Sequence, residues 1–234
     1  MAQKDVTEKA LEAYNDVFSD IVNVFLFGGE QRVKAESLEE AATNSIYFDD
    51  EKFRQQDRDI AKYWNNNLIR IARLNIENQT EDCFDMPIRV MNYDSAGYRS
   101  QMGKRSAEKK YVPIITMVLY FNYEKRWLGP RNLRDCVDAL PELKAYINDY
   151  PIQVFEVAFQ SEEEVQLFCS DFRYVADYLV QMRKSRDYIP SPDEFRHYYE
   201  VCHLLSLFTN DHRFEEAAKE LHEKKGRKPR CVNC

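Results

Sequence analysis

The stretch "RLNIENQTEDCFDMPIRV", Arg73–Val90, decides the fold of this chain. Its apolar run, Leu74–Ile76, gives way to Glu77, Asn78 and Gln79, where a strand is still expected to be half buried. Side chains alternate along a strand, so Glu77 and Gln79 share one face while Asn78 points to the other. A carboxylate and a carboxamide two residues apart at a strand end raise the question of what they bind.

The residues around this stretch predict an antiparallel hairpin. The segments Asp57–Trp64 and Leu68–Gln79 flank Asn65–Asn67, and asparagine tolerates the positive φ angles of tight turns. The second arm carries apolar residues on both faces, which is typical of a central strand. The end of this arm is therefore expected at the centre of a sheet.

Aspartates of the first arm are expected to converge on Glu77. A three-residue turn places Asp57 nearer to Glu77, whereas a bulge or a looser turn shifts the register towards Asp59, so counting leaves both open. Two carboxylates and the Asn78 carbonyl form a hard-oxygen site, which suits Mg²⁺ or Mn²⁺. Such an ion can generate hydroxide and stabilise charge on a phosphoryl oxygen. Ordinary solvated acids at a strand end are the alternative interpretation.

Hydrophobic periodicity predicts an α/β fold with a helical C-terminal part. Apolar residues recur at helical spacing over residues 4–27, and Gly28 and Gly29 are expected to end that helix. Uncharged, β-branched runs predict buried strands at Tyr111–Phe121 and Ile152–Phe159. Further helices are expected at 37–42, 86–103, 161–169, 171–187 and 191–208.

Composition and charge narrow the classes of function. The net charge of −7 makes the overall field of the protein repel DNA. No apolar run approaches the roughly 18 residues of a membrane helix, and the N-terminal residues are unlike a signal peptide, so we expect a cytoplasmic protein. The first four of the six cysteines are scattered and fit a reducing compartment, and the C-x-x-C of Cys231 and Cys234 offers too few ligands for structural zinc. The basic segment Lys224–Arg230 is either a phosphate contact or a solvated tail.

Several segments, taken in order, resemble one family. These are "NDVFSDIVNVFLF", "RDIAKYW", "IRIARLNIENQTEDCFDMPIRVMNYDSAGY", "YVPIITMVLYF", "INDYPIQVFEVAF" and "DFRYVADYLVQMRKSRDY". The set is similar to the Rpn family of recombination-promoting nucleases, YhgA-like proteins also described as transposases, within the PD-(D/E)XK nuclease superfamily. The resemblance covers roughly Tyr14 to Phe214, and the order of the blocks carries it, because no single tripeptide is specific.

The resemblance implies a restriction-endonuclease-like fold, in which helices flank a mixed central sheet and a hairpin carries the metal site. We expect the core over residues 1–160, a helical extension packed on it over 161–222, and a basic, flexible tail over 223–234. The implied activity is DNA cleavage that depends on Mg²⁺ or Mn²⁺. The alternative is a catalytically inactive nuclease-fold protein that binds DNA or protein, and a homo-oligomer is a further expectation.

Carried over by position, the resemblance assigns the site residues. The metal-binding aspartate falls on Asp59, which is thereby favoured over Asp57, and the acid of the (D/E)XK element falls on Glu77. The Asn78 carbonyl completes the implied metal ligands. The lysine position falls on Gln79, which is a departure from the superfamily pattern.

Two further groups are needed to complete such a site. The superfamily often adds an acid from the first core helix, for which we favour Asp20 over Asp16. Gln79 can orient a water but adds no charge, so catalysis then depends more on the metal, or on a base from elsewhere. Arg73 lies about 13 Å back along the strand and Lys62 has the wrong parity, so we expect neither to replace the lysine.

Overall fold

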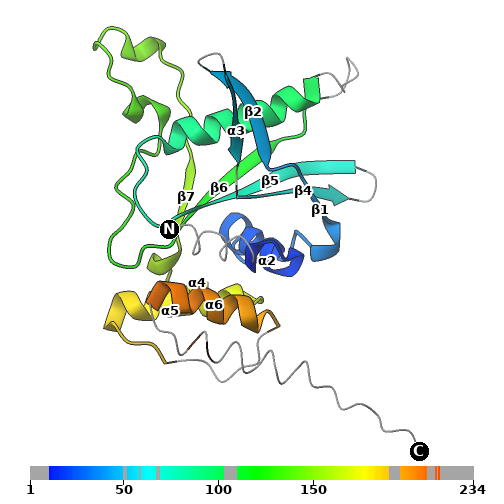
Figure 1. The fold of residues 1–234 in the computed structure, drawn as a ribbon, viewed down its shortest axis with the longest axis vertical. Helices are drawn as coiled ribbons and strands as arrows, with labels where there is room; N and C mark the ends of the chain where they lie inside the picture. The colour runs from blue at the N-terminus through cyan, green and yellow to red at the C-terminus, as the bar shows by residue number, and fades with distance from the viewer. Residues whose placement is uncertain are drawn as a thin grey trace, which may run out of the picture.

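The computed structural model shows a mixed sheet with helices on both faces (Figure 1). Five strands form it in the order β1-β4-β5-β6-β7, and β2 and β3 form a separate two-stranded sheet. This is the predicted α/β architecture, and it is consistent with a restriction-endonuclease-like fold. The structure describes residues 11–49, 52–57, 59–66, 69–102, 110–189, 196–209, 214 and 216.

The bounds of the elements follow the chain. The strands are β1 (Leu38–Glu40), β2 (Asn44–Asp49), β3 (Lys52–Asp57), β4 (Ile60–Asn66), β5 (Ile69–Gln79), β6 (Ile114–Tyr120) and β7 (Gln153–Glu156). The α-helices are α2 (Asn15–Phe27), α3 (Met86–Met102), α4 (Glu162–Val165), α5 (Phe172–Ser185) and α6 (Tyr198–Thr209). Short 3-10 helices lie at Ala35–Ser37, Leu133–Cys136, Lys144–Tyr146 and Val157–Phe159.

The β4–β5 hairpin lies at the centre of the sheet. β5 pairs with β4 in antiparallel fashion and with β6 in parallel fashion, so it is a central strand as predicted. Ile60 pairs with Ile76, and the register shifts once, between Trp64 and Asn65. This irregularity close to the turn matches the alternative that favoured Asp59 as the neighbour of the β5 end.

β5 presents an apolar face to one side of the sheet and a polar face to the other. On the side of α2, Leu74 and Ile76 join the main apolar core, to which α5 and α6 also contribute. On the side of α3, the strand carries polar side chains at every second position, and most of them are buried. These polar residues are Arg73, Asn75, Glu77 and Gln79. Buried polar groups need partners, so this stripe is a place where specific interactions gather.

Helix α3 connects β5 to β6, because parallel neighbours require a crossover. Pro87 stands in its first turn, where a missing N–H is tolerated. Met86 and Val90 pack on the sheet in a second apolar cluster. At Gly97, an added Cβ atom would overlap Cδ1 of Ile114. Glycine therefore lets this part of α3 lie directly on β6.

The helices after residue 160 cover the α2 side (Figure 1). Ser161 caps α4: its hydroxyl accepts the Glu164 N–H at 3.1 Å, and the Glu164 carboxylate accepts the Ser161 N–H at 2.7 Å, as the capping-box pattern predicts. α5 and α6 bury their apolar sides in the same core as α2. The division between 1–160 and 161–222 thus stays a prediction, and the tail 223–234 with its C-x-x-C lies outside the described residues.

Four expectations about local structure are wrong. The helix expected over 4–27 is interrupted at residues 13–14, before α2 begins at Asn15, and the helix expected at 161–169 ends at Val165. The short helix expected at 37–42 is instead β1, because Leu38 is buried and pairs with Trp64 at the sheet edge, which overrides local helix propensity. The strand expected over Ile152–Phe159 ends at Glu156, after which the chain turns into a 3-10 helix. Within the described residues, no helix has both the length and the apolar character that spanning a lipid bilayer demands.

Candidate active site at the end of the central hairpin

Asp59 and Glu77 meet at the open end of the β4–β5 hairpin. Asp59 directly precedes β4, and its Oδ2 accepts a hydrogen bond of 2.7 Å from the backbone N–H of Asn78. The pKa of Tyr93, in α3, is raised chiefly by burial, and the negative charges of Glu77 and Asp59 raise it further. Both carboxylates therefore act on one buried phenol, which places them on the α3 side of the sheet.

Glu77 is almost fully buried, with 1% of its surface exposed. Its Oε1 accepts a hydrogen bond from Nη2 of Arg89 within an ion pair. Gln79 donates from Nε2 to the same oxygen at 3.5 Å, so Glu77 and Gln79 share a face as strand alternation predicts. A buried carboxylate is costly unless a cation and hydrogen bonds compensate its charge, and this site provides both.

Arg89 reaches the site from the first turns of α3. It also donates to Oη of Tyr93 at 3.5 Å and, more weakly, to Sγ of Cys83 at 3.9 Å. Burial alone would lower the pKa of Arg89, but the charge of Glu77 and the bonds to Tyr93 and Cys83 raise it, so the guanidinium stays charged. Its side chain is 34% exposed. The group is thus anchored on one side and open to water on the other.

Asn78 points to the opposite face, as predicted. Its Nδ2 donates to Oε2 of Glu12 at 2.7 Å, and both side chains are buried. Oδ1 of Asn78 has no hydrogen-bond partner among the described residues. Glu12, which comes just before α2, is therefore the N-terminal acid that the structure brings to the end of β5.

Asp20 and Asp16 do not reach this place. Oδ2 of Asp20 accepts the backbone N–H groups of Cys169 and Ser170 at 2.9 and 2.7 Å, so it fastens the segment before α5 to α2. Asp16 lies 3.0 Å from Nε2 of His197. Asp57 ends β3 in the separate two-stranded sheet.

Glu12 and Arg89 were missed by sequence reasoning, although each carries a signal. Glu12 precedes Asp16 by four residues, so it extends the same helical spacing by one turn. Arg89 is a cation near the start of α3, where the helix macrodipole disfavours positive charge. A cation at such a position indicates a nearby anion.

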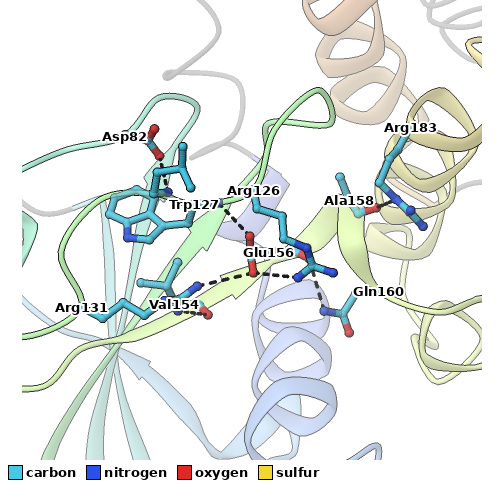
Figure 2. A network of polar contacts seen from close by, with 10 residues as sticks. Asp82, Arg126, Trp127, Arg131, Val154, Glu156, Ala158, Gln160 and Arg183 are labelled. Atoms are coloured by element: carbon cyan, nitrogen blue, oxygen red, sulfur yellow. Dashed lines mark hydrogen bonds and ion pairs between the residues drawn. The ribbon is translucent and has the colours of Figure 1, made fainter.

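Figure 2 shows a second polar cluster, around Glu156. The strand register places it on the same face of the sheet as Gln79. Glu156, at the end of β7, accepts the backbone N–H of Trp127 at 2.8 Å and pairs with Arg126 and Arg131 at 3.3 and 3.4 Å. Arg131 also donates to the Val154 carbonyl at 3.2 Å. These bonds fasten the loop after β6 to β7.

The donor set at Glu77 fits Mg²⁺ or Mn²⁺ rather than a cage of many protein ligands. Across the part of the chain that the structure describes, no three His, Cys, Asp or Glu side chains gather into a metal-binding group. Mg²⁺ is commonly bound through one or two carboxylates and keeps several waters. Asp59 and Glu77, together with the backbone carbonyl of Asn78, are oxygen donors of that kind. In this structure the guanidinium of Arg89 neutralises Glu77.

Comparison with family models matches residues 37–191 to the family described as putative transposase, YhgA-like. The chain belongs to this family. The YhgA-like match spans more than half of the sequence and includes Asp59, Glu77, Gln79 and Arg89, whereas Glu12 precedes it. Comparisons with curated proteins and with solved structures gave no match. The match confirms the resemblance that the ordered sequence blocks carry.

Proposed function

We propose that this YhgA-like protein is an endonuclease that hydrolyses DNA phosphodiester bonds with Mg²⁺ or Mn²⁺. One observation carries the proposal: Asp59, just before β4, and Glu77, near the end of β5, lie on the α3 side of the sheet, where the charges of both raise the pKa of Tyr93. Neighbouring carboxylates repel each other unless a cation compensates them, and a divalent ion does so for both.

Each residue has a distinct part in this proposal. Asp59 and Glu77 hold the ion with the backbone carbonyl of Asn78, and the amide of Gln79 orients the attacking water by hydrogen bonding. When bound, a divalent ion neutralises charge on a phosphoryl oxygen and makes water more acidic. The bond from the Asn78 N–H to Asp59 fixes that carboxylate in place before substrate arrives.

Cleavage of supercoiled plasmid by the full chain tests the proposal. Wild type is expected to cut with Mg²⁺ or Mn²⁺ and not with a chelator, while Glu77→Gln and Asp59→Asn are expected to slow cutting by about 100-fold or more. Glu156→Gln is the matched control, since it changes the same residue type on the same face of the sheet, and it should cut like wild type. Equal cutting by Glu77→Gln and wild type, or no cutting by wild type, contradicts the proposal.

A second candidate is a nuclease-fold protein that binds DNA without cutting it. The ion pair between Glu77 and Arg89 favours this candidate, because a guanidinium already satisfies the carboxylate that a metal would use. It predicts that wild type and Glu77→Gln bind a labelled duplex equally and that neither cuts. Mn²⁺ would then leave the melting temperature unchanged, since a ligand that binds the folded state must raise it by mass action.

A further inference from the structure

Phosphodiester hydrolysis builds negative charge on the phosphate oxygens, and enzymes place cations there. Gln79 brings no charge to the position where a lysine is expected. The described cations of the hairpin are engaged elsewhere: Arg70 lies over the ring of Tyr63, and Arg73 donates to the Ala42 carbonyl. The ammonium of Lys62 donates to the Ala13 carbonyl at 2.8 Å on the other face. A positive charge for the phosphate must therefore come from another element.

Arg89 of α3 has the position and the freedom for this task. Its guanidinium contacts Glu77, so it already lies where the substrate phosphate is expected. Tyr93 and Cys83 hold it independently of Glu77, which means that it stays near the site when Glu77 turns to a metal ion. About a third of its surface faces water, so N–H groups remain accessible to an incoming anion.

We propose that Arg89 binds the phosphate under attack and supplies the positive charge that a lysine in place of Gln79 would supply. The inference rests on the proposed nuclease function. A guanidinium is planar and permanently charged, and its parallel N–H groups match two phosphate oxygens. In the DNA-free protein the same group neutralises Glu77, so Arg89 and a divalent cation compete for that carboxylate.

Two readouts on the full chain test this inference. Arg89→Gln is expected to lower the single-turnover cleavage rate at saturating Mg²⁺ by about 100-fold. Calorimetric titration should show that it binds Mn²⁺ about two- to fivefold more tightly, because the competing cation is gone. Arg99→Gln, in the last turn of the same helix, is the matched control and should change neither quantity. A role confined to pairing with Glu77 would tighten Mn²⁺ binding without slowing cleavage, so the two readouts together separate it from a phosphate contact.

The outcomes separate this inference from the function it rests on. If wild type cuts with metal and Arg89→Gln cuts equally fast, or if its Mn²⁺ affinity does not rise, the role of Arg89 is wrong while the nuclease stands. If wild type does not cut with any divalent metal, the nuclease proposal itself fails. Should Arg89→Gln not fold, Arg89→Lys is tested instead. An ammonium lacks the two parallel N–H groups of a guanidinium, so this variant should cut about tenfold more slowly than wild type. Cutting at the wild-type rate would contradict a contact between Arg89 and the phosphate.

Discussion

Glu77 and Glu156 are two glutamates on one face of one sheet, and each pairs with arginine, but their surroundings differ. Gln79 of β5 is level with Tyr120 of β6, which is level with Glu156, so the two clusters are roughly 10 Å apart across the strands. Glu156 accepts a backbone N–H and two guanidinium groups, and its side chain is 14% exposed. Glu77 is more buried, has one guanidinium, and lies beside a second carboxylate.

Glu156 holds a loop in place, whereas Glu77 has the surroundings that the proposed metal site needs. A backbone N–H fixes Glu156 to a loop, and its arginines complete a closed set of bonds (Figure 2). Glu77 has a neighbour of like charge in Asp59, and Arg89 is the cation that compensates Glu77 in the structure. An arginine partner alone therefore does not distinguish the two clusters, whereas the second carboxylate does.

The largest expected effect contrasts the two glutamates directly. Glu77→Gln should weaken Mn²⁺ binding by about 100-fold or more, because it removes a charged ligand, while Glu156→Gln should change it by less than about twofold. Calorimetric titration of both variants measures the contrast. Comparable losses in the two variants would erase the distinction between the clusters.

The next largest effect is expected on stability at Asp20, a carboxylate that accepts hydrogen bonds from backbone N–H groups. Asp20→Ala leaves the N–H groups of Cys169 and Ser170 without their acceptor and should lower the free energy of unfolding by about 2 kcal/mol. Urea denaturation measures this loss. The Mn²⁺ affinity of the folded variant should equal that of wild type; weaker binding would return Asp20 to the metal site.

Glu156 itself should have a smaller effect on stability. Glu156→Gln keeps an acceptor for the Trp127 N–H but loses two partly exposed ion pairs, so unfolding should need about 1 kcal/mol less. Added salt should shrink the difference, since it screens exposed pairs. A urea midpoint equal to that of wild type at low salt would show that the ion pairs contribute nothing.

The smallest effect is a pH dependence at Asp20. Burial raises the pKa of Asp20 above its ordinary value, although the N–H bonds from Cys169 and Ser170 oppose this. The folded state then binds this proton more tightly than the unfolded state, so the stability from it is present at low pH and is lost as pH rises through the raised pKa. Unfolding of wild type and Asp20→Asn should thus differ increasingly in favour of the variant as the pH rises above the ordinary pKa of an aspartate. A constant difference contradicts the shift.

Much of the fold can be predicted from the sequence because its signals are local. The β-branched run at Tyr111–Phe121, the two arms of the hairpin and the helix at 86–103 reappear as β6, as β4 and β5, and as α3. The edge strand β1 could not be predicted, since its pairing partner β4 decides it and "SLEEAA" alone favours helix.

Some of the site residues could likewise be placed from the sequence, and others could not. Glu77 and Gln79 can be placed together by strand alternation, and their shared face is observed. The register that brings Asp59 to them depends on an irregularity in the hairpin that residue counting leaves open. Glu12 meets Asn78 from 66 residues away, a contact that only the packed fold defines.

Gly97 sets how closely the second half of α3 lies on β6. Because no side chain separates it from Ile114, α3 rests on β6 there, and Arg89 lies about 12 Å back along the same rigid helix. A methyl group at this position would push against the terminal methyl of Ile114, so either that side chain turns away or this end of α3 moves off the sheet. In the second case the guanidinium of Arg89 would move relative to Glu77 although no polar atom had been changed.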